Sequence, residues 1–168
     1  MLVVLAVLGV STQAAAFEIS GGVSVGGILA GTAPHLAVSP HGDISWPMTS
    51  GFVFAAHETI SILPPTHMDG PGVYEETSVA IGYAAETRNF SVGPSLSVYS
   101  IPACGATLCG RVAGVAPGGH AQVNAYFYGR LGISVNGTLS WIGGRSYVLP
   151  GGVVAMVVAG PVFRWSPE

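Results

Sequence analysis

Long stretches of alternating side-chain character constrain the fold of this chain more than any other feature. In "LGISVNGTLSW", residues 131–141, the apolar side chains Leu131, Ile133, Val135, Leu139 and Trp141 share one parity, and small or polar residues occupy the other. Successive side chains of a β-strand point to opposite faces, so this stretch predicts a strand with one apolar and one small polar face. Seven further segments between residues 17 and 165 are strand-like, which predicts eight strands. The last of these, 151–165, is apolar on both parities, so its sequence does not indicate which face of the strand lies inside.

The scarcity of charge limits which surroundings the apolar faces can meet. Only 8% of the 168 residues are charged, with five basic and eight acidic side chains, whereas an ordinary globular domain has roughly 25%. No apolar run reaches the roughly 20 residues that a membrane-spanning helix needs. The chain also has no basic patch that could neutralise phosphates, so we expect no nucleic-acid partner. Its glycine clusters lack the Lys and Ser/Thr of a phosphate-binding loop, and we expect no cofactor.

The links between the predicted strands alternate in length. Short links lie at 47–50, 86–89 and 128–130, and longer ones at 63–76, 102–110 and 143–151. The first link, at 31–34, is the exception, because it is short although it lies at the same end as the longer links. Short turns at one end, longer loops at the other and an even number of strands are typical of outer-membrane barrels. Predicted strands of nine to fifteen residues also suit a tilted crossing of a bilayer better than the usual soluble strand of about five or six.

The small polar parity indicates which face lies inside. A soluble lipocalin-like barrel would turn its apolar parity inward around a ligand, and its Ser, Gly, Asn and Thr parity would then form a poorly soluble outer surface. An eight-stranded membrane barrel instead needs small and medium side chains to fill its narrow interior. We therefore expect an all-β, eight-stranded antiparallel up-and-down transmembrane β-barrel, with a secreted ligand-binding barrel as the alternative.

The first 16 residues resemble a secretory signal, with an apolar run from Leu2 to Val10 and small residues before Phe17. This predicts a signal peptide over 1–16 and a barrel domain over 17–168.

In an exported protein, the close pair Cys104 and Cys109 predicts a disulfide that staples a loop. The export signal and the eight amphipathic strands are similar to the small OmpA- and OmpX-like barrels of Gram-negative bacteria. This resemblance implies an outer-membrane location, lipid as the surroundings and outward loops that contact an unknown partner.

The candidate chemical groups share the parity predicted to face inward. These are His35, His41, Asp43, His57 and His120, and we interpret them as filling the lumen through hydrogen bonds with Glu18, Glu86, Arg130 or Arg164. No tight ligand motif or nucleophile motif is present, so we predict no catalytic and no metal-binding residue. A lipid hydrolase remains a third hypothesis, although neighbouring residues such as His57 and Glu58 point to opposite faces of a strand.

Aromatic side chains are candidates for girdles at both membrane surfaces. They are Trp46, Trp141, Trp165, Tyr74, Tyr83 and Tyr147, whereas the parity of Tyr99 is luminal.

Overall fold

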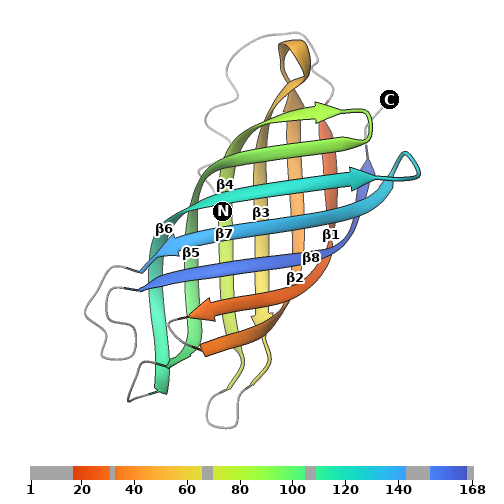
Figure 1. The fold of residues 1–168 in the computed structure, drawn as a ribbon. Helices are drawn as coiled ribbons and strands as arrows, with labels where there is room; N and C mark the ends of the chain where they lie inside the picture. The colour runs from red at the N-terminus through yellow and green to blue at the C-terminus, as the bar shows by residue number, and fades with distance from the viewer. Residues whose placement is uncertain (1–16, 31–32, 66–69, 105–108, 143–151, 166–168) are drawn as a thin grey trace.

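The chain folds into one closed antiparallel barrel of eight strands, as predicted (Figure 1). The structure is a computed structural model that describes residues 17–30, 33–65, 70–104, 109–142 and 152–165. The strands are β1 (Glu18–Ala30), β2 (Ala33–Pro47), β3 (Phe52–Leu63), β4 (Gly72–Ala85), β5 (Arg88–Cys104), β6 (Cys109–Tyr126), β7 (Leu131–Trp141) and β8 (Val153–Trp165). Each strand pairs with the next along the chain, and β8 pairs with β1, so the described sheet has no free edge.

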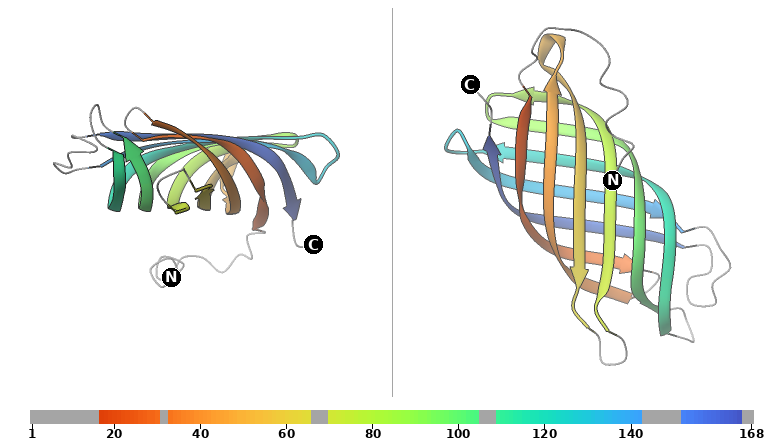
Figure 2. Two further views of the ribbon diagram at one scale, coloured as in Figure 1. Left: turned by 90° about the horizontal axis from the view of Figure 1, so that it is seen from below. Right: turned by 180° about the vertical axis from the view of Figure 1, so that it is seen from behind.

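The pairing register tilts the strands against the barrel axis. Directly paired residues, followed once around the sheet from Arg164 on β8 through Ser20 on β1, return to β8 at Val154, a shift of ten residues. Such a shift over eight strands corresponds to a tilt of roughly 40–45°. Figure 2 shows the same tilted strands from behind, with β8 beside β1.

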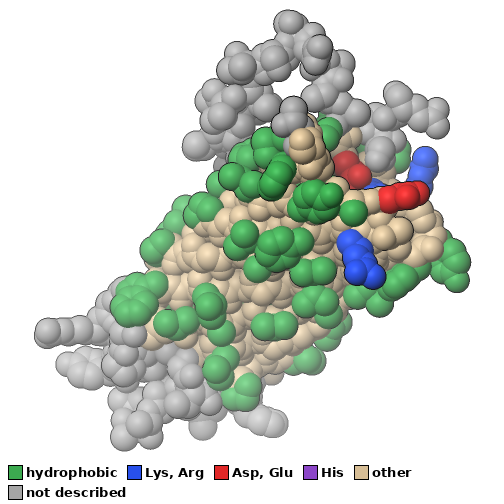
Figure 3. Space-filling model, turned by 45° about the horizontal axis from the view of Figure 1, so that its top comes forward, with side chains coloured by type: hydrophobic (Ala, Val, Ile, Leu, Met, Phe, Trp, Pro, Cys, Tyr) green, Lys and Arg blue, Asp and Glu red, His purple; other side chains and the backbone are tan. Residues whose placement is uncertain are grey.

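The apolar parity faces outward and the small polar parity faces inward. On β7, Leu131, Ile133 and Val135 are 49%, 48% and 43% exposed, while Ser134 and Asn136 are 0% and 1% exposed. Figure 3 shows apolar side chains spread over the visible wall, with charged side chains gathered toward one end. The outer wall is therefore an apolar surface, and the orientation predicted from residues 131–141 is confirmed.

The strand β8 has apolar side chains on both faces. Its residues Val154, Met156, Val158 and Val162 are buried in the lumen, and the alternate residues are mostly exposed on the wall. Glycine is required at the inward position Gly160, because a Cβ there would lie 2.2 Å from the carbonyl oxygen of Val23 on β1. The seam between β8 and β1 is thus closed by a very close backbone approach.

The two ends of the barrel differ in their connections. Residues 48–51, 86–87 and 127–130 make the short turns, and we call this the short-turn end. The connection after β3 is shorter than the predicted loop 63–76, because β4 already begins at Gly72, and β5 and β6 extend to Cys104 and Cys109. Tyr128 lies in the last of the short turns, within the predicted link 128–130, and is 83% exposed. No described helix is long and apolar enough to cross a membrane.

Exposed aromatic side chains form a ring at the short-turn end. They are Phe17, Phe52, Phe54, Tyr83, Phe90, Phe127, Tyr128, Phe163 and Trp165, and the half-buried Trp46 packs beside Phe54 in the same ring. Phe52 packs edge-on against Tyr83 with ring centroids 6.0 Å apart. At the opposite end, Trp141 is the exposed aromatic residue among the described strands. Tyr74 was a girdle candidate but is fully buried in the lumen. Tyr99 is buried there as predicted, and Tyr147 lies outside the described residues.

The interior changes character along the barrel axis. A cluster of buried, mainly apolar side chains fills the lumen toward the long-connection end, and we call it the apolar cap. Its members are Ile28, Ala30, Ala37, Leu63, Tyr74, Tyr99, Ile101, Ala116, Ile142, Val154, Met156 and Val158. The rest of the lumen is mainly polar, as the sequence predicts, although Val53, Ala55, Ala80 and Val162 are also buried there. The cap is an addition that the parity pattern did not reveal.

Candidate functional site

Two histidine–carboxylate pairs occupy the middle of the lumen. His57 Nδ1 on β3 lies 2.5 Å from Asp43 Oδ1 on β2, and His120 Nδ1 on β6 lies 2.9 Å from Glu76 Oε1 on β4. The two imidazole rings stack, with centroids 4.7 Å apart and planes 30° apart. All four side chains are at most 6% exposed. A buried carboxylate must be paired or hydrogen-bonded, and the imidazoles provide these partners.

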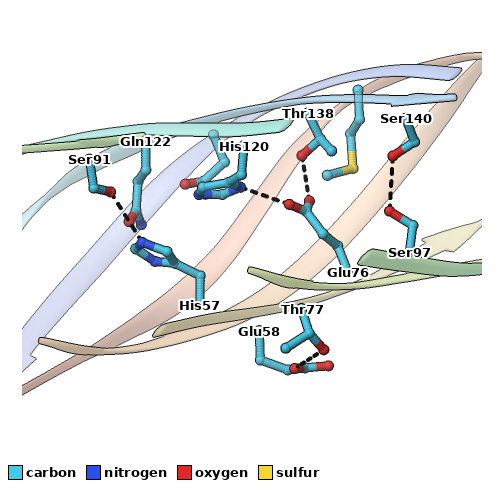
Figure 4. A network of polar contacts seen from close by, with 12 residues as sticks. His57, Glu58, Glu76, Thr77, Ser91, Ser97, His120, Gln122, Thr138 and Ser140 are labelled. Carbon is cyan, nitrogen blue, oxygen red and sulfur yellow. Dashed lines mark hydrogen bonds and ion pairs between the residues drawn. The ribbon is translucent and has the colours of Figure 1, made fainter. Parts of the chain in front are cut away.

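Each carboxylate also accepts hydrogen bonds from neutral side chains. Ser20 Oγ and Gln122 Nε2 both donate to Asp43 Oδ2, each at 3.0 Å. Thr138 Oγ1 donates to Glu76 Oε2 (Figure 4). These bonds come from strands on different sides of the barrel, so the network ties the wall together through its centre.

A ring of hydroxyl groups separates this network from the apolar cap. Tyr74 Oη lies 2.8 Å from Ser97 Oγ and 2.7 Å from Ser140 Oγ, and these two serine hydroxyls are 2.9 Å apart. Ser61 Oγ on β3 is 3.1 Å from the sulfur of Met156. The burial of the Tyr74 ring is therefore explained: its apolar ring belongs to the cap, and its hydroxyl meets the polar section.

Ser91, His57 and Asp43 have the connectivity of a Ser–His–Asp triad. Ser91 Oγ is 3.1 Å from His57 Nε2, and His57 Nδ1 contacts Asp43. A triad works only when the substrate carbonyl can reach the serine oxygen. Ser91, His57 and Asp43 are 6%, 5% and 6% exposed, so a lipid or other acyl substrate cannot reach Ser91 in this structure. The arrangement orders the lumen and does not form an accessible active site.

The structure places all the candidate histidines in the lumen but does not join them into a metal centre. His41 Nδ1 is 3.4 Å from Ser24 Oγ. His35 lies nearer the long-connection end of β2, paired with Ile28 of the apolar cap. Within the ranges that the structure describes, no group of three or more His, Cys, Asp or Glu side chains could hold a metal ion. His41, His57 and His120 each lie within hydrogen-bond distance of another luminal side chain.

None of the four predicted partners bonds to a described histidine: Glu18 and Arg164 contact each other, and His57 and His120 pair with Asp43 and Glu76 instead. Glu86 and Arg130 are exposed at the short-turn end and do not reach the histidines. Glu76 was missed because residues 63–76 were expected to form a loop. Its inward parity, shared with Tyr74 and Ser78, was the available signal. Glu58, next to His57, points outward and accepts a hydrogen bond from Thr77 Oγ1 at 2.7 Å (Figure 4).

Arg164 crosses the lumen at the short-turn end. Its guanidinium lies 3.7 Å from Glu18 Oε2, stacks 4.2 Å above the Tyr126 ring, and donates to the carbonyl oxygens of Gly129 and Glu86 at 2.7 and 3.2 Å. The side chains of Arg164 and Glu18 remain 17% and 23% exposed. Solvent thus reaches this end of the polar lumen.

The cysteine prediction stays untested by the geometry. Cys104 on β5 and Cys109 on β6 are directly paired across the two strands. The side chains of both residues lie outside the described part of the structure, so the disulfide remains a prediction.

Together these features define a class of fold: a small closed barrel of eight tilted strands, apolar outside and largely polar inside. Among solved structures, the chain is similar to the crystal structure of Neisserial surface protein A (NspA), with a TM-score of 0.57 and 11% sequence identity over 89% of this chain and 97% of that one. It is also similar to the N-terminal β-barrel domain of Pseudomonas aeruginosa OprF, with a TM-score of 0.48 and 14% identity over 90% and 98% of the two chains. No protein-family model and no curated protein matches the chain. The likeness to NspA confirms the predicted barrel fold.

Proposed function

We propose that the chain is a non-enzymatic barrel of a Gram-negative outer membrane, with the lipid bilayer as its surroundings. The observation that carries this proposal is the facing of the strands, which exposes a continuous apolar wall and buries the polar side chains. A closed barrel satisfies its backbone hydrogen bonds internally, so it can lie in hydrocarbon. In water, the same wall would be a large apolar surface and would promote association.

The position in the bilayer follows from the ends of the barrel. The aromatic ring at the short-turn end, which includes Trp46, Phe90 and Trp165, suits the level of the lipid headgroups. Short turns in such barrels are periplasmic and longer connections extracellular. We place the ring at the periplasmic surface on this basis. The export that this location requires is assigned to residues 1–16 as a signal peptide, with 17–168 as the mature barrel.

The molecular role that we propose is structural or that of a surface contact. The longer connections, such as those that join β3 to β4 and β7 to β8, would contact a partner outside the cell. A lipid hydrolase is disfavoured because the Ser91, His57 and Asp43 side chains are buried. A soluble ligand-binding barrel is disfavoured because the wall, not the lumen, carries most of the apolar side chains.

Fractionation and gel mobility test this proposal. We expect the expressed chain to float with outer-membrane vesicles and to migrate differently on a gel when unboiled, because a folded barrel stays closed in detergent. Recovery as a monomer from a detergent-free periplasmic extract would overturn the membrane assignment. An altered lipid acyl profile on expression that His57→Ala abolishes would overturn the non-enzymatic assignment.

A further inference from the structure

Several buried polar atoms of the lumen have no hydrogen-bond partner in the protein. Those in the middle of the barrel are His41 Nε2, Ser78 Oγ, Ser95 Oγ, His120 Nε2 and Asn136 Nδ2, which come from five different strands. Each of these residues is at most 8% exposed. Nearer the short-turn end, Asn124 Oδ1 and Tyr126 Oη are also without a protein partner. Such atoms therefore extend from the histidine pairs to the short-turn end, and one outside this section, His35 Nε2, lies beside the cap residue Ile28.

Buried polar atoms in native proteins are almost always satisfied, and ordered water satisfies those that the protein does not. Leaving one unsatisfied is strongly unfavourable. The candidate atoms belong to the polar section of the lumen and include both donors and acceptors, which are the groups that ordered water satisfies. The partly exposed Arg164 and Glu18 connect this section with bulk solvent.

The opposite end of the lumen excludes water. The cap residues Ile28, Leu63, Ile101 and Val154 are all 0% exposed, and they come from β1, β3, β5 and β8. The last hydroxyls before the cap, those of Tyr74, Ser97 and Ser140, bond to one another. An apolar constriction of this kind stops water and ions by dewetting.

We propose that the barrel is a one-ended water channel: water and protons enter at the short-turn end, reach the His57–Asp43 and His120–Glu76 pairs, and stop at the apolar cap. This inference rests on the proposed membrane location. It assigns to the cap a function that packing alone does not require, because the cap keeps a hydrated polar lumen from becoming a leak across the membrane.

Proton flux into vesicles that enclose a pH-sensitive dye tests the proposal. The full chain is reconstituted as wild type and as the double variant Ile28→Ser/Leu63→Ser, which places hydroxyls inside the cap. The matched control is Leu29→Ser/Ile62→Ser, which makes the same change at neighbouring positions that face outward, 46% and 48% exposed. We expect wild type and control to match empty vesicles. The cap variant should raise the flux by at least about tenfold, equivalent to about 1.4 kcal/mol off the barrier.

A second cap variant, Ile142→Thr/Val154→Thr, keeps β-branched side chains and guards against misfolding of the first. The inference is overturned if a cap variant that shows the folded gel mobility leaks no more than the outward control, or if wild type already leaks. A chain that neither floats with vesicles nor shows a folded mobility refutes the proposed membrane location instead, so the two failures are distinguishable.

Discussion

An arginine on the outer wall should be tolerated near the end of a strand and not at its middle. Val135 and Leu131 both face outward on β7, 43% and 49% exposed. Val135 lies four residues from Leu131, which at about 3.3 Å per residue and the tilt of the strands is a depth of roughly 10 Å below the aromatic ring. In a bilayer, Val135→Arg then places a charge close to the midplane, whereas Leu131→Arg stays near the surface.

The expected difference is large enough to measure. An arginine on the lipid face destabilises a barrel by about 2–4 kcal/mol at the midplane and by about 0–1 kcal/mol near the interface. Val135→Arg should therefore lower the free energy of unfolding by about 2 kcal/mol more than Leu131→Arg does. Urea titration of the folded fraction in lipid vesicles, followed by gel mobility, gives both values. A water-facing wall would make the two substitutions nearly equivalent, within about 0.5 kcal/mol, and that result would refute the membrane-facing wall.

Three further substitutions test the interior, the seam and the cysteines. Asp43→Asn removes charge-assisted hydrogen bonds in the lumen and should lower the urea stability by about 2 kcal/mol, whereas the exposed Glu86→Gln should not; equal effects would contradict the buried network. Gly160→Ala should prevent closure of the seam and abolish the folded gel mobility, and Gly119→Ala, whose added Cβ has its nearest neighbour at 4.0 Å, should fold normally. Cys104→Ser should lower the stability by about 2 kcal/mol under oxidising conditions and leave it unchanged under reducing ones; the same loss in both would argue against a disulfide.

The alternation of side chains predicted the strands and their facing because a strand has only two faces. The strict pattern at 131–141 therefore identified Ser134 and Asn136 as luminal residues. The same rule failed at β8, where both parities are apolar, because the inward row there packs into the apolar cap. The start of β4 was missed for a different reason: prolines at 64, 65 and 71 and glycines at 70 and 72 are typical of a loop, and they obscured the alternation that continues through Tyr74 and Glu76.

The contacts of the candidate site were less predictable than its members. Parity placed His57, His120 and Asp43 inside the barrel, but it does not say which side chains meet. The pairing of His57 with Asp43 requires the β2–β3 register, and the stacking of His57 on His120 requires strands on different sides of the barrel to meet at its centre. These are consequences of tilt, radius and register, which depend on the whole sheet.

The one-sided aromatic ring has a consequence for membranes of different thickness. Aromatic side chains hold their level at the headgroups, so a barrel with such a ring at one end is fixed in height there. Among the residues that the structure describes, the opposite rim has Trp141 but otherwise exposes mainly aliphatic side chains such as Leu29, Leu36 and Val73, which do not prefer the headgroup level. A thicker or thinner bilayer should then be accommodated mainly at the long-connection end. The height of the outward loops above the membrane would vary with lipid composition. The short turns would keep a constant distance from the periplasmic surface, where the aromatic ring lies.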